Sequence, residues 1–206
     1  MNNPIVSWSE LLRVLVDTPV AILQRLGADI SGVPLVLDGN AGPLTEGGIF
    51  LNPIGPHVPG ARTAIQELLA GAQETGRGNT GKWVSKYYQR ELSDPRDHGA
   101  WCAAFASWCL GQDIEDAPYS WSARRLHKRM RSIPQPRLGC LATWERASAG
   151  PYNGHSGIVV HIETGGAVWT VEGNTGPRGA VRAYRWLPPY TRAVDKLIGF
   201  AEVPHG

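Results

Sequence analysis

Hydrophobic positions have helical spacing in several segments between residues 61 and 130, and the pattern changes to that of strands after Pro136. Residues 61–74 place Ala64, Ile65 and Leu68 on one face, which predicts an amphipathic helix. Three further helices are predicted: one that starts near Thr80, one over residues 100–111 that ends at Gly111, and one over residues 120–130. Strands are predicted within 138–145, 155–163, 167–174, 181–186 and 196–203, which contain β-branched and aromatic residues.

This order of elements predicts an α+β domain. Helices that precede a run of strands pack against one antiparallel sheet, which we expect to be a meander. Thr164-Gly165-Gly166 has the composition of a hairpin turn between the second and third strands. A hairpin centred there pairs Gly157 with Glu172 and His155 with Asn174.

The chain divides near residue 60. Residues 5–27 have apolar positions at helical spacing, and Pro19 splits them into two short helices. Residues 49–60 contain three prolines and predict a linker. We therefore expect a small helical segment over residues 1–60 and a larger domain over residues 61–206.

Composition and charge narrow the class of protein. The 206 residues carry a formal net charge of +2 without a block of Lys or Arg, which argues against a nucleic-acid partner. No run approaches the roughly 18 apolar residues of a membrane span, so stable membrane insertion is not expected. The N-terminus lacks the features of a secretory signal, so we expect synthesis in the cytoplasm without a signal peptide. The absence of C-x-x-C and H-E-x-x-H motifs predicts no metal site.

The three cysteines do not suggest a disulfide framework, but one of them is placed for chemistry. Cys102 lies at the predicted start of a helix, where the helix dipole and unpaired N–H groups stabilise a thiolate. Cys109 lies two turns deeper in the same helix, and Cys140 lies in a predicted strand. We interpret both of these as core thiols and Cys102 as the candidate nucleophile.

A thiolate nucleophile needs a base and a group that orients the base. His155 opens a strong strand at a sheet end and is the leading candidate; His161 shares its face and is the rival. His98, in the turn before Cys102, is a weaker candidate. Glu172 and Asn174 point the same way from the next strand, and either could orient His155.

These residues resemble a known family. W-C-A-A-F at a helix start, G-H-S-G-I-V-V and V-E-G-N-T on paired strands are similar to the CHAP amidase/peptidase family, related to the NlpC-type cell-wall peptidases, over about residues 61–203. The resemblance implies a papain-like cysteine hydrolase that cuts peptidoglycan. It implies Cys102 as nucleophile, His155 as general base, and Glu172 and Asn174 as its polar partners, with no metal or other cofactor.

The N-terminal segment has a second, shorter resemblance. Asp38, Gly39, Gly42 and Thr45 fit the D-G-x-x-G-P-x-T pattern of small helical peptidoglycan-binding domains. The alternative is an ordinary helical pair with an Asp-Gly turn, and the sequence leaves both open.

Two surface features are candidates for substrate contact. Trp101 flanks Cys102, and a tryptophan can stack on sugar rings or peptide planes. The helix over 120–130 has a basic side, which is either simply solvated or attracted to an anionic cell wall; its residues are Arg124, Arg125, Lys128, Arg129 and Arg131.

The expected function is therefore cleavage of an amide bond in the peptide part of peptidoglycan, by a monomer. Two settings fit a wall-directed hydrolase of this kind: a phage endolysin released with a holin, or an antibacterial effector paired with an immunity protein. Either would act in the periplasm or cell wall of the target bacterium. The alternatives are a non-catalytic wall-binding protein that keeps the fold, and a cysteine protease or transglutaminase that acts on protein.

Overall fold

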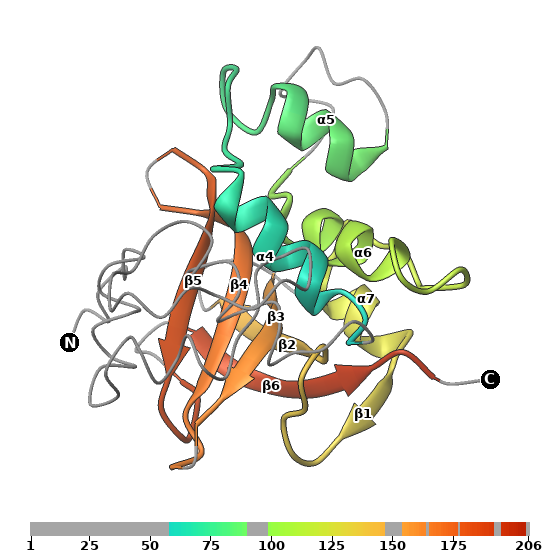
Figure 1. Cartoon of the computed structure of the whole chain (residues 1–206), viewed down its shortest axis with the longest axis vertical. Coiled ribbons are helices and arrows are strands. Elements are labelled where there is room, and N and C mark those ends of the chain that lie inside the picture. Colours follow the sequence, from blue (N-terminus) through green and yellow to red (C-terminus); the bar gives the residue numbers. More distant parts are fainter. Residues whose placement is uncertain are drawn as a thin grey trace, which may run out of the picture.

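The computed structural model describes residues 58–89, 99–146, 154–163, 165–176, 178–191 and 195–204 (Figure 1). The predicted N-terminal helices, the possible peptidoglycan-binding pattern and His98 lie outside the described residues. The larger domain can be followed from its first helix, which begins at Ala61, directly after the predicted boundary.

Four helices confirm the predicted helical segments. They are α4 (Ala61–Leu69), α5 (Lys82–Tyr88), α6 (Cys102–Gly111) and α7 (Ala123–Lys128). The chain leaves α5 at Gln89, whose backbone is left-handed with φ 55°, a conformation that ends a helix. Before α7, the Ser122 hydroxyl accepts a hydrogen bond from the Arg125 backbone N–H and caps the helix. In the part of the chain that the structure describes, no helix has the length and apolar character needed to cross a membrane.

Six strands form one antiparallel sheet in the order β1-β6-β2-β3-β4-β5. They are β1 (Arg131–Ile133), β2 (Leu141–Arg146), β3 (Gly154–Ile162), β4 (Val168–Thr175), β5 (Ala180–Trp186) and β6 (Asp195–Glu202). The α+β prediction and the five predicted strands are confirmed.

The prediction of a simple meander is wrong at its two ends. Strands β2 to β5 follow one another, but β6 pairs with β2 and lies far from β5 in the sheet. The first four residues of β2 are all buried, so this strand needs a neighbour on each side, and β6 covers the edge that a meander would leave open. The short strand β1, which the sequence did not predict, extends the sheet beyond β6.

Helices α4 and α6 pack on β3 and β4, and α7 lies against β2 at the other side of α6 (Figure 1). Apart from Phe105 and Leu110, the buried residues of α6 are small, which lets the helix come close to the sheet. The closest approach is at Gly173 of β4, where a Cβ atom would lie 2.7 Å from Trp101 Cζ3 and 2.8 Å from Phe105 Cβ. This contact brings the start of α6 against β3 and β4.

Candidate active site

The thiol of Cys102 lies where α6 begins. Cys102 is the first residue of the helix and is 2% exposed. Its Sγ lies 3.9 Å from the backbone oxygen of Gly154, the first residue of β3. The first N–H groups of a helix have no acceptor within the helix, so the amide of Cys102 can donate to a group bound beside the thiol.

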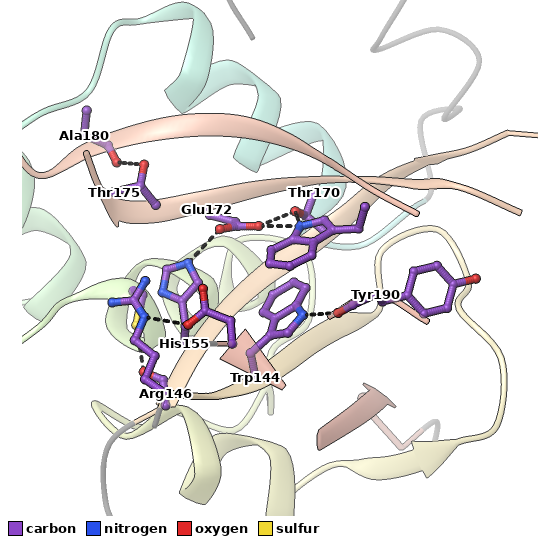
Figure 2. Close-up of polar contacts among 12 residues, drawn as sticks. Trp144, Arg146, His155, Thr170, Glu172, Thr175, Ala180 and Tyr190 are labelled. Atoms are coloured by element: carbon purple, nitrogen blue, oxygen red, sulfur yellow. Dashed lines mark hydrogen bonds and ion pairs between the residues drawn. The ribbon is translucent and has the colours of Figure 1, made fainter. Parts of the chain in front are cut away.

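His155 and Glu172 meet on neighbouring strands. His155 Nε2 lies 2.7 Å from Glu172 Oε2, and both side chains are almost completely buried (Figure 2). Glu172 pairs with Gly157 across β3 and β4, which is the predicted register. A side chain at position 157 would collide with Glu172, because a Cβ atom there would lie 2.5 Å from Glu172 Cγ. The missing Cβ leaves room for the carboxylate beside the imidazole.

The second oxygen of Glu172 is held by two donors. Glu172 Oε1 accepts hydrogen bonds from Thr170 Oγ1 at 2.5 Å and from Trp186 Nε1 at 2.9 Å. Figure 2 shows the carboxylate between Thr170 and the ring of His155. An indole N–H can only donate, so these bonds fix the orientation of the carboxylate and direct Oε2 toward His155.

The pKa of Cys102 is lowered and that of His155 is raised, and both shifts favour an ion pair between the two side chains. Burial by itself lowers the pKa of His155, but the adjacent Glu172 carboxylate and Cys102 raise it to about 9. Burial raises the pKa of the Cys102 thiol and is the largest single effect, but the lowering effects, led by the His155 cation, together outweigh it, and the net pKa is lowered. Arg146 lowers the same pKa further, as does the backbone of Ser156. Both shifts therefore favour a thiolate at Cys102 beside an imidazolium at His155.

The other two polar candidates lie away from this contact. Asn174 is in β4 at φ 57°, within the irregular stretch of the β4–β5 ladder. Among the described residues no hydrogen bond joins its side chain to His155, whose partner is Glu172. His161 lies toward the other end of β3, opposite Trp169, and burial lowers its pKa. The structure brings Cys102, His155 and Glu172 together.

Residues 93–174 match the family model of the CHAP domain. The chain contains a CHAP domain. Among curated proteins and among solved structures, none matches the chain. CHAP domains are in general cysteine-dependent amidases or endopeptidases, and the domain implies a peptidoglycan hydrolase. The helices packed on an antiparallel sheet agree with the papain-like fold of this family.

A cleft opens beside Cys102 in the CHAP domain. Its volume is about 520 Å³, and Gly154 lines it together with Cys102. Three aromatic side chains from two segments of the chain also line the cleft: Tyr88, Tyr119 and Trp121. Trp121 is 50% exposed and packs edge-on against Tyr88, with ring centroids 5.7 Å apart.

Trp101, the predicted substrate contact, has no exposed surface. Its ring stacks on Tyr87 at a centroid distance of 5.4 Å, and its Nε1 donates to Glu74 Oε1 at 2.9 Å. A side chain without exposed surface cannot stack on a bound sugar, so the structure gives Trp101 a packing role. Trp121 is the tryptophan that lines the cleft, and its sequence context of serines and a proline gave no signal of this.

The basic face predicted from the sequence is divided by the fold. Arg124 donates to Glu145 Oε1 at 2.5 Å, and Arg131 forms an ion pair with Glu202. Arg125 and Arg129 line the cleft. Lys128 is exposed at the end of α7.

Arg146, at the end of β2, is a site residue that sequence reasoning missed. It points toward His155 (Figure 2), and its Nε lies 3.5 Å from Asp195 Oδ1 at the start of β6. The only sequence signal was its position one residue beyond a predicted strand. Its place in the site depends on the pairing of β2 with both β3 and β6.

The remaining cysteines have thiols that burial keeps protonated. Burial raises the pKa of Cys109 well above its ordinary value and raises that of Cys140 to about 12. Within the described ranges, no group of three or more His, Cys, Asp or Glu side chains is placed to hold a metal ion. Among the three cysteines, Cys102 is the one whose thiol has a lowered pKa.

Proposed function

We propose that this CHAP domain hydrolyses an amide bond in the peptide part of bacterial peptidoglycan through a thioester on Cys102. The observation that carries the proposal is the continuous chain from Cys102 through His155 to Glu172, placed at the wall of an open cleft. A nucleophile, a base and an orienting carboxylate in this order are the groups that cysteine hydrolases require.

In the first half of the reaction the Cys102 thiolate attacks the carbonyl carbon of the substrate amide. The carbonyl π electrons move to oxygen, and the resulting oxyanion lies near the Cys102 N–H at the start of α6. His155 then gives its proton to the amide nitrogen as the C–N bond breaks. The products of this half are a free amine and a thioester on Cys102.

In the second half water hydrolyses the thioester. Neutral His155 takes a proton from a water molecule while the water oxygen attacks the thioester carbon. The C–S bond then breaks, and its electron pair returns to sulfur. The free carboxylic acid leaves, and the thiolate–imidazolium pair is restored. Glu172 keeps its hydrogen bond to Nε2 throughout and leaves Nδ1 to exchange protons with sulfur, substrate and water.

The test is the release of soluble fragments from purified sacculi by wild type and by Cys102→Ala. Cys109→Ala is the matched control, because it removes a buried thiol from the same helix. We expect release by wild type and Cys109→Ala and none by Cys102→Ala. Equal release by wild type and Cys102→Ala would reject the catalytic assignment, and release of amines from casein instead of sacculi would favour a protein substrate. Mass spectrometry of the fragments distinguishes the N-acetylmuramoyl-L-alanine bond from a stem or cross-bridge peptide bond.

For the biological setting we propose a phage endolysin or an antibacterial effector delivered to the wall of a target bacterium. Both settings bring a peptidoglycan hydrolase to its substrate from a cytoplasm. A holin gene beside the coding sequence would support the first, and an adjacent gene whose product inhibits the enzyme would support the second.

A further inference from the structure

The cleft beside Cys102 has one cationic wall. Arg125 and Arg129 lie one helical turn apart, so their side chains extend from the same side of α7. Both line the cleft that also contains Cys102 and Gly154. Arg129 donates from its NH1 group to the backbone oxygen of Tyr119 at 2.5 Å, which holds the guanidinium against the cleft wall.

The partner of Arg129 in this bond is a neutral carbonyl. A guanidinium has five N–H donors and a full positive charge. The bond to the carbonyl oxygen of Tyr119 uses one donor, and because this acceptor is neutral, the bond does not neutralise the charge of Arg129. The neighbouring cations of the basic face are used differently, because Arg124 and Arg131 pair with Glu145 and Glu202. Arg125 and Arg129 thus place two guanidinium groups on the side of α7 that lines the cleft.

Aromatic rings complete this wall. Trp121 and Tyr119 line the cleft next to the arginines, and half of the Trp121 surface is open to solvent. A planar ring beside a guanidinium suits a peptide, because the ring covers a peptide plane while the guanidinium binds a carboxylate in two parallel hydrogen bonds.

We propose that Arg125 and Arg129 form a subsite for a free carboxylate of the substrate peptide, close to the scissile amide. This inference rests on the proposed function. Stem peptides of peptidoglycan carry such carboxylates, and some are converted to primary amides. The subsite therefore makes the enzyme selective for the unamidated peptide.

The experiment measures binding without catalysis. Cys102→Ala protein is titrated by calorimetry with a synthetic muropeptide that has free carboxyl groups, and with the same muropeptide carrying primary amides in their place. We expect about tenfold tighter binding of the acid form, the size of one charge-assisted contact at an accessible site. Adding Arg125→Gln should remove most of this preference, and higher salt should weaken it.

Lys128→Gln is the matched control, because it removes one positive charge from the exposed end of the same helix. It should keep the tenfold preference, and circular dichroism should show that both Gln variants are folded. Equal affinity for the two muropeptides, no measurable binding of either, or the same loss in the Lys128 variant would overturn the subsite. If wild type still releases fragments from sacculi in a Cys102-dependent way, the proposed function stands without the subsite; if it does not, the proposed function fails.

Discussion

Replacing Glu172 by Gln removes the negative charge beside His155 with little change of shape. The orientation of the new amide follows from its other contacts. Trp186 Nε1 and Thr170 Oγ1 both donate to the present Oε1, so the amide oxygen of Gln takes that place. The NH2 group then faces His155 Nε2, where the wild type has an acceptor at 2.7 Å. An imidazolium cannot donate to an NH2 group, so the variant disfavours the charged histidine.

The size of the effect follows from the pKa of His155. A pKa of about 9 in place of the ordinary 6.5 corresponds to about 3 kcal/mol in favour of the imidazolium. Burial lowers this pKa and Glu172 is the main group that raises it, so the pKa should fall to the ordinary value or below in Glu172→Gln. At pH 8 the imidazolium population then falls roughly 30-fold or more. Without the cation, burial dominates and the pKa of Cys102 rises.

The assay is the rate of Cys102 alkylation by iodoacetamide from pH 5 to pH 10, followed by mass spectrometry. Wild type should react fast at neutral pH, and Glu172→Gln should react at least about 30-fold more slowly at pH 8 and recover only above the ordinary thiol pKa. Hydrolysis by wild type should decline above about pH 9, as His155 loses the proton that the leaving amine needs.

Glu163→Gln is the control for this substitution. Glu163 also accepts a hydrogen bond from an indole, that of Trp169, at 2.8 Å, but its ionic partner is Arg185. Its alkylation profile should match wild type. The same profile for wild type and Glu172→Gln, with both folded, would refute the assignment of Glu172 as the group that charges His155.

Four further substitutions test the fold, the cleft and the electrostatics of the site. Gly173→Ala should lower the free energy of unfolding by about 1–3 kcal/mol in urea denaturation, because its Cβ would overlap Trp101; an unchanged midpoint would contradict the close approach of α6. Trp121→Ala should raise KM with little change in the unfolding midpoint, whereas Trp101→Ala should cost about 3–5 kcal/mol of stability, and the reverse order would contradict the packing role. Arg146→Gln should move the Cys102 alkylation profile to higher pH by less than about one pH unit, and a shift to lower pH would exclude its electrostatic role.

Elements formed by neighbours in sequence were predicted well. The small and aromatic residues before Gly111 predicted a helix over residues 100–111 with Cys102 close to its start, and the observed helix runs from Cys102 to Gly111. The Gly-rich turn after β3 set the pairing of Gly157 with Glu172 correctly, because a short hairpin leaves little choice of register. The strand β1 was missed because its three residues have no local period and depend on β6, about seventy residues away.

The wall of the cleft could not be predicted in this way. The sequence favoured Trp101 for substrate contact because it flanks Cys102, but Trp101 is enclosed by α5 and β4 while Trp121 lies at the cleft. Likewise, Arg124 and Arg125 are adjacent in the chain, and only their directions from α7 decide that one pairs with Glu145 and the other lines the cleft.

The sequence by itself determined the candidate nucleophile, the candidate base and the pair of candidate orienting residues. Each depends on local structure: a cysteine at a helix start, and polar residues on one face of a hairpin. Only the tertiary structure decided that Glu172 contacts His155. The carboxylate is directed by Trp186 and Thr170, whereas Asn174 lies in the irregular stretch of the ladder with β5. The charge of the site is also non-local, because the burial that opposes both ions and the partners that outweigh it come from α6, β2, β3 and β4 together.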